Sequence, residues 1–187
     1  MKRRRLVAGI SLIFIVPWVF SPMIEDICKD HESTDITGCM STLAEYRAAS
    51  ALSNEAGSYY GKNYRKSMEL HKKAAATGWA NSSYDMWYVG KMYDEGYGVS
   101  RNLEEAIKWY TKSAELGDSG AQISLGVLYH LEASIQNYTL SHMWLSIALE
   151  NGGRSATITK KKVEPKMTEA ELLESARLTK DWIAAHP

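Results

Sequence analysis

Three segments of the chain share one spacing of polar, small and bulky residues. Each begins with Asn and reaches Gly 15 residues later, in the pairs Asn63–Gly78, Asn102–Gly117 and Asn137–Gly152. Small residues lie four and eleven positions after each Asn, and a large one lies seven positions after it. Because offsets of four, seven and eleven fall on one face of an α-helix, each segment predicts a helix with one packed face.

The ends of these helices carry the residues that start and stop a helix. Asn is a preferred N-cap, since its side chain accepts a hydrogen bond from a free N–H of the first turn. Glu105, three residues after Asn102, adds a capping-box pattern to the second segment. The Gly after each segment supplies the left-handed residue that ends it.

A second set of helices is predicted before these segments, over residues 84–93 and 121–129. The two match at Gly90/Gly126 and at Tyr93/Tyr129. Gly within a helix costs up to about 1 kcal/mol relative to Ala, so its recurrence predicts a close crossing with another helix. Asp85 stands where the later segment has a small residue, and we expect it to tilt out to solvent rather than to be paired.

The connections between paired helices differ. Residues 94–101 contain Gly96 and Gly98 around Tyr97, which permits a tight loop with positive φ. That loop joins two helices and lacks a following Gly-Lys-Ser/Thr, so it is not a phosphate loop. Residues 130–136 lack both glycines, and the pattern does not predict their path.

These residues carry a family resemblance, through the motifs Leu125-Gly126-x-x-Tyr129, Tyr93-x-x-Gly96-x-Gly98-Val99, Ala106-x-x-Trp109-Tyr110 and Ala114-x-x-Gly117-Asp118. They resemble the Sel1-like repeat, a relative of the tetratricopeptide repeat. The resemblance implies an all-α fold, a short right-handed α-solenoid. We expect a repeat array over residues 41–153 and capping helices over 154–187.

The predicted end of the array has its own signals. Thr168 and Glu171 form a capping-box pattern at the start of a helix that runs through Trp182, and Pro165 should break the helix before it. A terminal helix of this kind would cover the last apolar face of a solenoid.

The N-terminus has the pattern of a targeting segment. Lys2-Arg3-Arg4-Arg5 precedes an apolar run from Leu6 to Phe20. We expect residues 1–24 to be a signal peptide or an uncleaved membrane anchor, with the rest of the chain across the membrane. Localisation in the bacterial periplasm or cell envelope follows.

Residues 25–40 are expected to be a linker that contains both cysteines, Cys28 and Cys39. In an oxidising compartment a disulfide between them is favoured. With His31 they also form a Cys-x-x-His…Cys set, but three irregularly spaced ligands make a zinc site the weaker alternative.

The remaining chemistry is sparse. The five histidines are scattered, at His31, His71, His130, His142 and His186, and none belongs to a catalytic motif; we expect His142 to be solvated. The adjacent acids Asp94-Glu95 and Glu104-Glu105 should point apart along their helices. We therefore predict no catalytic residue, no cofactor and no metal. The formal net charge of +0 also argues against a nucleic-acid binder.

What remains is a binding surface. In solenoids the first helices of successive repeats line a concave groove. The candidates for that lining are Tyr84, Trp87, Tyr88, Lys91, Ser124 and Val127. The alternative, that Trp87 and Tyr88 belong to the core between repeats, stays open.

The resemblance implies an exported or membrane-tethered adaptor or scaffold that binds another protein or peptide, with membrane contact through the N-terminal segment if it is uncleaved. One alternative is an immunity-type inhibitor that binds a toxic effector in the periplasm. Another is an enzyme of cell-wall or β-lactam chemistry, to which some exported Sel1-like proteins that resemble cysteine-rich arrays have been linked. No cysteine lies inside a repeat here, which disfavours that last interpretation.

Overall fold

The computed structural model describes residues 36–78 and 82–186, and the chain divides into two compact units, residues 1–47 and 48–187. In the first unit the described residues are the beginning of helix α2 (Ile36–Tyr59). The stretch expected as a linker is therefore helical from Ile36 onward.

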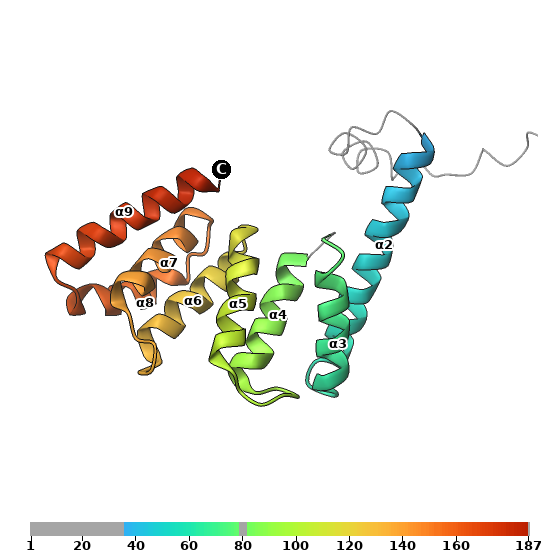
Figure 1. The fold of residues 1–187 in the computed structure, drawn as a ribbon, viewed down its shortest axis with the longest axis horizontal. Helices are drawn as coiled ribbons and strands as arrows, with labels where there is room; N and C mark the ends of the chain where they lie inside the picture. Colours follow the sequence, from blue (N-terminus) through green and yellow to red (C-terminus); the bar gives the residue numbers. More distant parts are fainter. Residues whose placement is uncertain (1–35, 79–81, 187) are drawn as a thin grey trace, which may run out of the picture. The chain divides into compact units, whose positions relative to one another are not determined.

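The second unit holds the end of α2 and then a succession of helices (Figure 1). These are α3 (Tyr64–Ala75), α4 (Ser82–Glu95), α5 (Leu103–Glu115), α6 (Ser119–Leu131), α7 (Tyr138–Glu150), α8 (Ala156–Val163), the 3₁₀ turn η2 (Glu164–Lys166) and α9 (Glu169–Ala185). From α3 to α8 each α-helix packs against the next one in the chain, and α9 packs on α7. The described residues contain no strand. The predicted all-α fold is confirmed.

The repeats correspond to three helix pairs, α2 with α3, α4 with α5 and α6 with α7. The second helix of each pair begins at the Asn that the sequence predicts as its N-cap. The side-chain oxygens of Asn63, Asn102 and Asn137 accept from backbone N–H groups three residues on, at 3.1, 3.0 and 2.9 Å. The capping box predicted at Asn102 is wrong in one of its two hydrogen bonds, because the Glu105 side chain does not accept from the Asn102 N–H. Glu105 turns its carboxylate to Lys108, and the Asn102 N–H donates to the Tyr93 carbonyl instead.

The glycines predicted to end these helices are confirmed as well. Gly78, Gly117 and Gly152 have φ of 69°, 82° and 80°. A residue with a Cβ is strained in this left-handed region, so Gly ends each helix at little cost.

The helix pairs cross closely at small residues, as predicted. A Cβ on Gly90 would lie 2.6 Å from Cδ1 of the buried Tyr110, and one on Gly126 would lie 2.5 Å from Cγ of Leu145. The Ser141 hydroxyl donates to the Gly126 carbonyl at 2.6 Å. The short side chains thus let one helix approach the backbone of the other.

One backbone hydrogen bond closes the connection in all three pairs. The N–H groups of Asn63, Asn102 and Asn137 donate to the carbonyls of Tyr59, Tyr93 and Tyr129, at 2.8, 2.9 and 2.8 Å. Residues 130–136, which lack glycines, reach this closure through a turn between Glu132 and Ile135 and a bond from Gln136 Nε2 to the His130 carbonyl at 2.9 Å.

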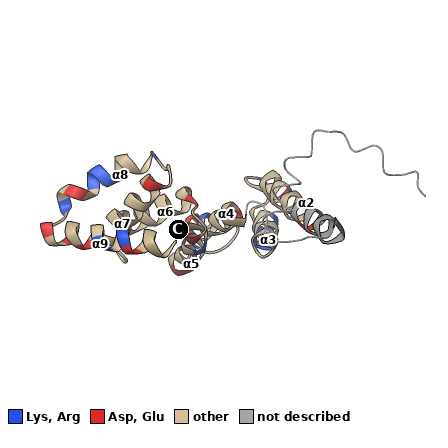
Figure 2. Ribbon diagram, turned by 90° about the horizontal axis from the view of Figure 1, so that it is seen from above, with Lys and Arg blue, Asp and Glu red and all other residues tan. Residues whose placement is uncertain are grey.

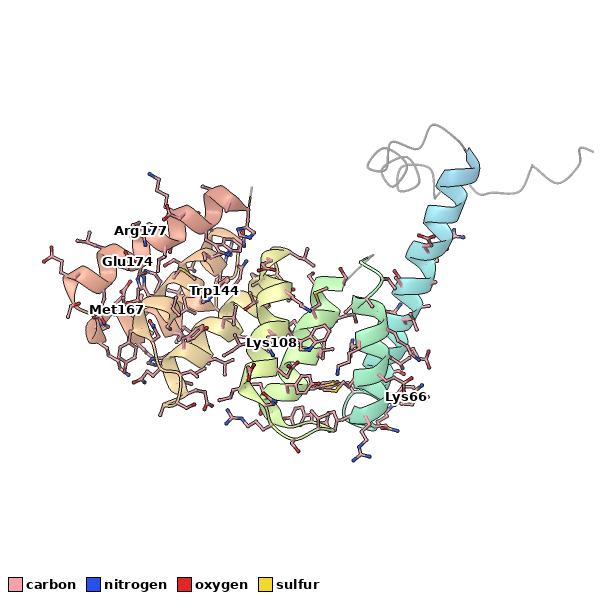
Figure 3. All side chains as sticks on the ribbon, viewed as in Figure 1. Lys66, Lys108, Trp144, Met167, Glu174 and Arg177 are labelled. Carbon is pink, nitrogen blue, oxygen red and sulfur yellow. The ribbon has the colours of Figure 1, made fainter. Side chains whose placement is uncertain are left out.

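The core of the unit runs through the second and third pairs. Its buried members are Ala106, Tyr110, Ala114, Ala121, Leu125, Leu128, Met143, Trp144 and Ile147. Helix α9 packs on α7, which carries Trp144 (Figure 3). The rings of Trp144 and Trp182 meet edge to face at 5.7 Å. The capping box of Thr168 and Glu171 is present, and Pro165 lies in η2, after α8 has ended.

His142 contradicts its prediction. Its side chain is buried, and Nδ1 lies 2.5 Å from the Ser175 hydroxyl on α9. Because α9 covers this side of α7, a residue that the repeat pattern placed in solvent becomes part of the contact with the terminal helix.

Candidate partner-binding face

Aromatic side chains gather on α4. The Tyr84 side chain is 44% exposed, while Trp87 and Tyr88 are half-buried. The Tyr88 ring lies 4.7 Å from that of Tyr84, 4.9 Å from that of Trp87 and 5.0 Å from that of Tyr60. We call Tyr60, Tyr84, Trp87 and Tyr88 the aromatic cluster.

Lys91 and Ser124 fix the cluster in place. Lys91 Nζ lies 5.3 Å from the Trp87 ring centroid and 5.8 Å from that of Tyr60, within the range of cation–π attraction. Trp87 Nε1–H donates to the Ser124 hydroxyl at 3.0 Å. This last bond ties α4 to α6, the first helices of two successive pairs.

The predicted groove residues are thus brought together, except Val127. Trp87 packs against the buried core while part of its ring stays exposed, so it takes part in both the core and the surface. Val127 lies farther along α6, in a separate pocket.

Sequence reasoning missed Tyr60. Its ring meets Tyr64 edge to face at 5.4 Å, and Tyr64 in turn stacks on Tyr97 at 4.6 Å. Burial raises the pKa of the Tyr60 hydroxyl to about 12, and the hydroxyl has no hydrogen-bond partner among the described residues. The glycines around Tyr97 were the one sequence feature that pointed to these tyrosine contacts, since Gly98 lets its loop approach Tyr64.

A buried polar pair lies beneath the cluster and overturns the expectation for Asp85. The Asp85 side chain is 1% exposed, and its Oδ1 lies 2.6 Å from Nδ1 of His71, which is fully buried. The His71 ring stacks on Tyr88 at 4.7 Å with an interplanar angle of 4°. Asp85 occupies a packed position because His71 supplies its partner from α3.

A pocket of about 380 Å³ opens between the end of α4 and α6. It is lined by Asp94, Glu95, Arg101, Val127, Leu128, Leu131 and Glu132, and we call it the acidic pocket. Arg101 contacts Glu132 and lies 3.5 Å from Asp94 Oδ1. The Leu131 side chain is 64% exposed at its rim.

The carboxylates of this pocket act on one another. Burial raises the pKa of the Asp94 carboxyl above its usual range, and the negative charges of Glu95 and Glu132 raise it further. Arg101 opposes the effect. Among the described ion pairs, none involves Glu95. The pocket therefore has more negative than positive side chains, three carboxylates and one guanidinium.

Comparison with known proteins identifies the family of the helical array. The family model of the Sel1 repeat matches residues 42–78, 83–118 and 119–153, more than half of the chain. The chain belongs to the Sel1 repeat family. Sel1 repeats generally mediate protein–protein interaction.

Curated relatives and solved structures share the array. The DAP3-binding cell death enhancer 1 of Rattus norvegicus is 35% identical over 109 residues, and that of Mus musculus is 30% identical over 96. These matches cover 52% and 47% of this chain but 21% and 18% of the relatives, so the chain spans about a fifth of their length.

Two solved structures resemble the fold. One is c5321, a protective antigen present in uropathogenic Escherichia coli strains and displaying an SLR fold, with a TM-score of 0.67 and 23% identity over 88% of this chain and 37% of that one. The other is a Sel1 repeat protein from Oxalobacter formigenes, with a TM-score of 0.52 and 25% identity over 73% of this chain and 57% of that one.

The described residues of the Sel1 array hold no candidate metal site. In residues 36–78 and 82–186, no three His, Cys, Asp or Glu side chains converge as metal ligands. The lysines of α8, blue in Figure 2, are in part neutralised, since Lys160 pairs with Glu164 at 2.7 Å. Lys161 and Lys162 are exposed.

The targeting segment over residues 1–24, Cys28, His31 and the side chain of Cys39 lie outside the described residues. The expected signal peptide or anchor and the expected disulfide stay predictions. Across the described part of the chain, no helix has both the length and the apolar character to cross a membrane.

Proposed function

We propose that this Sel1 array is a non-catalytic adaptor that holds a segment of another protein against α4 and α6. The observation that carries the proposal is the aromatic cluster, which is half-exposed and yet held in position by Lys91 and Ser124. Preorganised aromatic side chains bury a large area on binding and lose little conformational freedom, which makes them frequent anchors of protein interfaces.

The buried pair of His71 and Asp85 supports a non-catalytic role. His71 Nδ1 and Asp85 Oδ1 are only 2.6 Å apart, but both side chains are buried and shielded from any substrate. Its contribution is to support Tyr88 from below. The name of the rat and mouse relatives records that they bind a protein, which agrees with an adaptor role and does not identify the partner here.

We propose further that the array works in the bacterial envelope, exported or tethered by its N-terminal segment. The support is the basic and apolar pattern of residues 2–20. Protease added to spheroplasts should digest a tag placed after Pro187. A tag that is digested only after the membrane is permeabilised would contradict this location.

Photo-crosslinking tests the adaptor proposal. A photoreactive residue at Tyr84 of the full-length protein should give a protein adduct in cells, and the same residue at Leu173, exposed on α9 far along the chain, should not. Adding Trp87→Ala should reduce the adduct about tenfold, as loss of an aromatic anchor does. An adduct that is unaffected by Trp87→Ala would refute binding at the aromatic cluster.

The identity of the adduct separates two roles. A secreted toxin that the array inactivates would make it an immunity-type inhibitor. A protein of envelope assembly would make it an adaptor.

A further inference from the structure

We infer that the acidic pocket takes a lysine or arginine side chain of the bound segment, so that the partner is a polypeptide with a basic residue near an apolar one. This inference rests on the proposed function and adds the chemistry of the partner to it. It is carried by the charge of the pocket, by its apolar wall and by its place along the same two helices as the aromatic cluster.

The charge of the pocket favours a cation. Its lining holds the three carboxylates of Asp94, Glu95 and Glu132 against the one guanidinium of Arg101. Arg101 is already engaged, since it contacts both Glu132 and the Asp94 carbonyl, the latter at 2.7 Å. Glu95 is exposed and has no counterion among the described ion pairs. A second cation would therefore complete the pocket.

The wall of the pocket favours a cation on a long apolar stem. Val127, Leu128 and Leu131 form one side, and Leu131 is a large apolar side chain left mostly in solvent. Lysine and arginine bury their methylene groups along apolar surfaces and keep the charged group at a polar edge. An inorganic cation would leave this wall uncovered.

The pocket continues the face that carries the aromatic cluster. Asp94 follows Trp87 by seven residues on α4, and Leu131 follows Ser124 by seven on α6. At 1.5 Å per helical residue each step is about 10 Å, which an extended peptide covers in about three residues. The structure thus points to a partner segment in which a basic residue lies about three residues from an apolar or aromatic one.

Selection from random peptides tests the inference. The full-length protein in detergent micelles is presented with a displayed library of random linear peptides, and bound peptides are eluted. We expect Lys or Arg to be enriched at one position, about three residues from an apolar one. A selected peptide, made synthetically, should bind about 10-fold more weakly when norleucine replaces its basic residue.

Variants of the protein complete the test. Glu95→Gln should weaken binding of the basic peptide about 5- to 10-fold and leave binding of the norleucine peptide unchanged. Glu150→Gln is the matched control, because it removes the same charge from an exposed position on α7 and should have no effect.

The outcomes separate the two proposals. If peptides bind in a manner that depends on Trp87 but show neither basic enrichment nor sensitivity to Glu95→Gln, the inference is wrong and the proposed function stands. If no selected peptide depends on Trp87, the proposed function fails and the inference fails with it.

Discussion

His71 Nδ1 lies 2.6 Å from Asp85 Oδ1, and both side chains are buried between α3 and α4. The contact joins the first helix pair of the unit to the second. It also places the imidazole flat beneath Tyr88, so a polar contact of the interior positions a side chain of the proposed binding face.

Asp85→Ala should lower the free energy of unfolding by roughly 3 kcal/mol, because it leaves His71 buried without its partner. Urea denaturation of the full-length protein measures the change. Glu104→Ala is the control, since it breaks an exposed ion pair with Lys108 and should cost less than about 0.5 kcal/mol. Replacing both His71 and Asp85 with Leu should recover part of the loss, and equal losses in Asp85→Ala and Glu104→Ala would contradict the role assigned to the pair.

Gly126→Ala should destabilise the unit by about 1 to 3 kcal/mol, because its Cβ would overlap Leu145 and press on the Ser141 carbonyl at 3.3 Å. Gly57→Ala is a matched change within α2, where a Cβ meets nothing within 4 Å. There the higher helix propensity of Ala should raise the free energy of unfolding by up to about 1 kcal/mol. Thermal unfolding midpoints that move in the same direction for both variants would argue against the close crossing.

Stability should fall in acid because of His142. Burial lowers the pKa of its imidazole below the ordinary 6.5, and the charge of Lys160 lowers it further, with Glu164 opposing. Between the lowered pKa and 6.5 the unfolded chain binds the proton and the folded chain does not. The free energy of unfolding therefore decreases as the pH falls below 6.5.

His142→Asn should flatten that decrease, as measured by urea denaturation across the same pH range. Burial also lowers the pKa of His130, so the double variant with His130→Asn should flatten it more. A single variant whose stability follows pH as steeply as the original protein would show that His142 is not the cause.

Trp182→Ala should destabilise the end of the array by about 2 kcal/mol, because it removes the ring that packs edge to face on the buried Trp144. Leu173→Ala, on the same helix at a 67% exposed position, should change stability by less than about 0.5 kcal/mol. Denaturant midpoints compare the two, and similar shifts would mean that α9 does not cover the core through Trp182.

Much of the local structure could be predicted because its causes are local. The N-caps at Asn63, Asn102 and Asn137 and the stops at the following glycines depend on residues within one helix. The repetition of the pattern also predicted the crossings at Gly90 and Gly126.

The failures have a common physical reason, which is that the deciding partner lies elsewhere in the chain. Asp85 is buried because of His71, 14 residues earlier, and His142 is buried because α9 supplies Ser175, 33 residues later. Tyr60 was missed because its place beside Tyr88 depends on how the first two helix pairs meet. A pattern within one repeat holds no information on such contacts.

The shared bond between each Asn N–H and the preceding Tyr carbonyl has a consequence for engineering. It closes connections of three, eight and seven intervening residues at nearly the same length. Three different loops thus end at the same closure of a helix pair. Foreign sequence, such as an epitope or a reporter peptide, should be tolerated as an insertion between the exposed residues Ala133 and Ser134, provided that Tyr129, Glu132, Ile135 and Asn137 are kept.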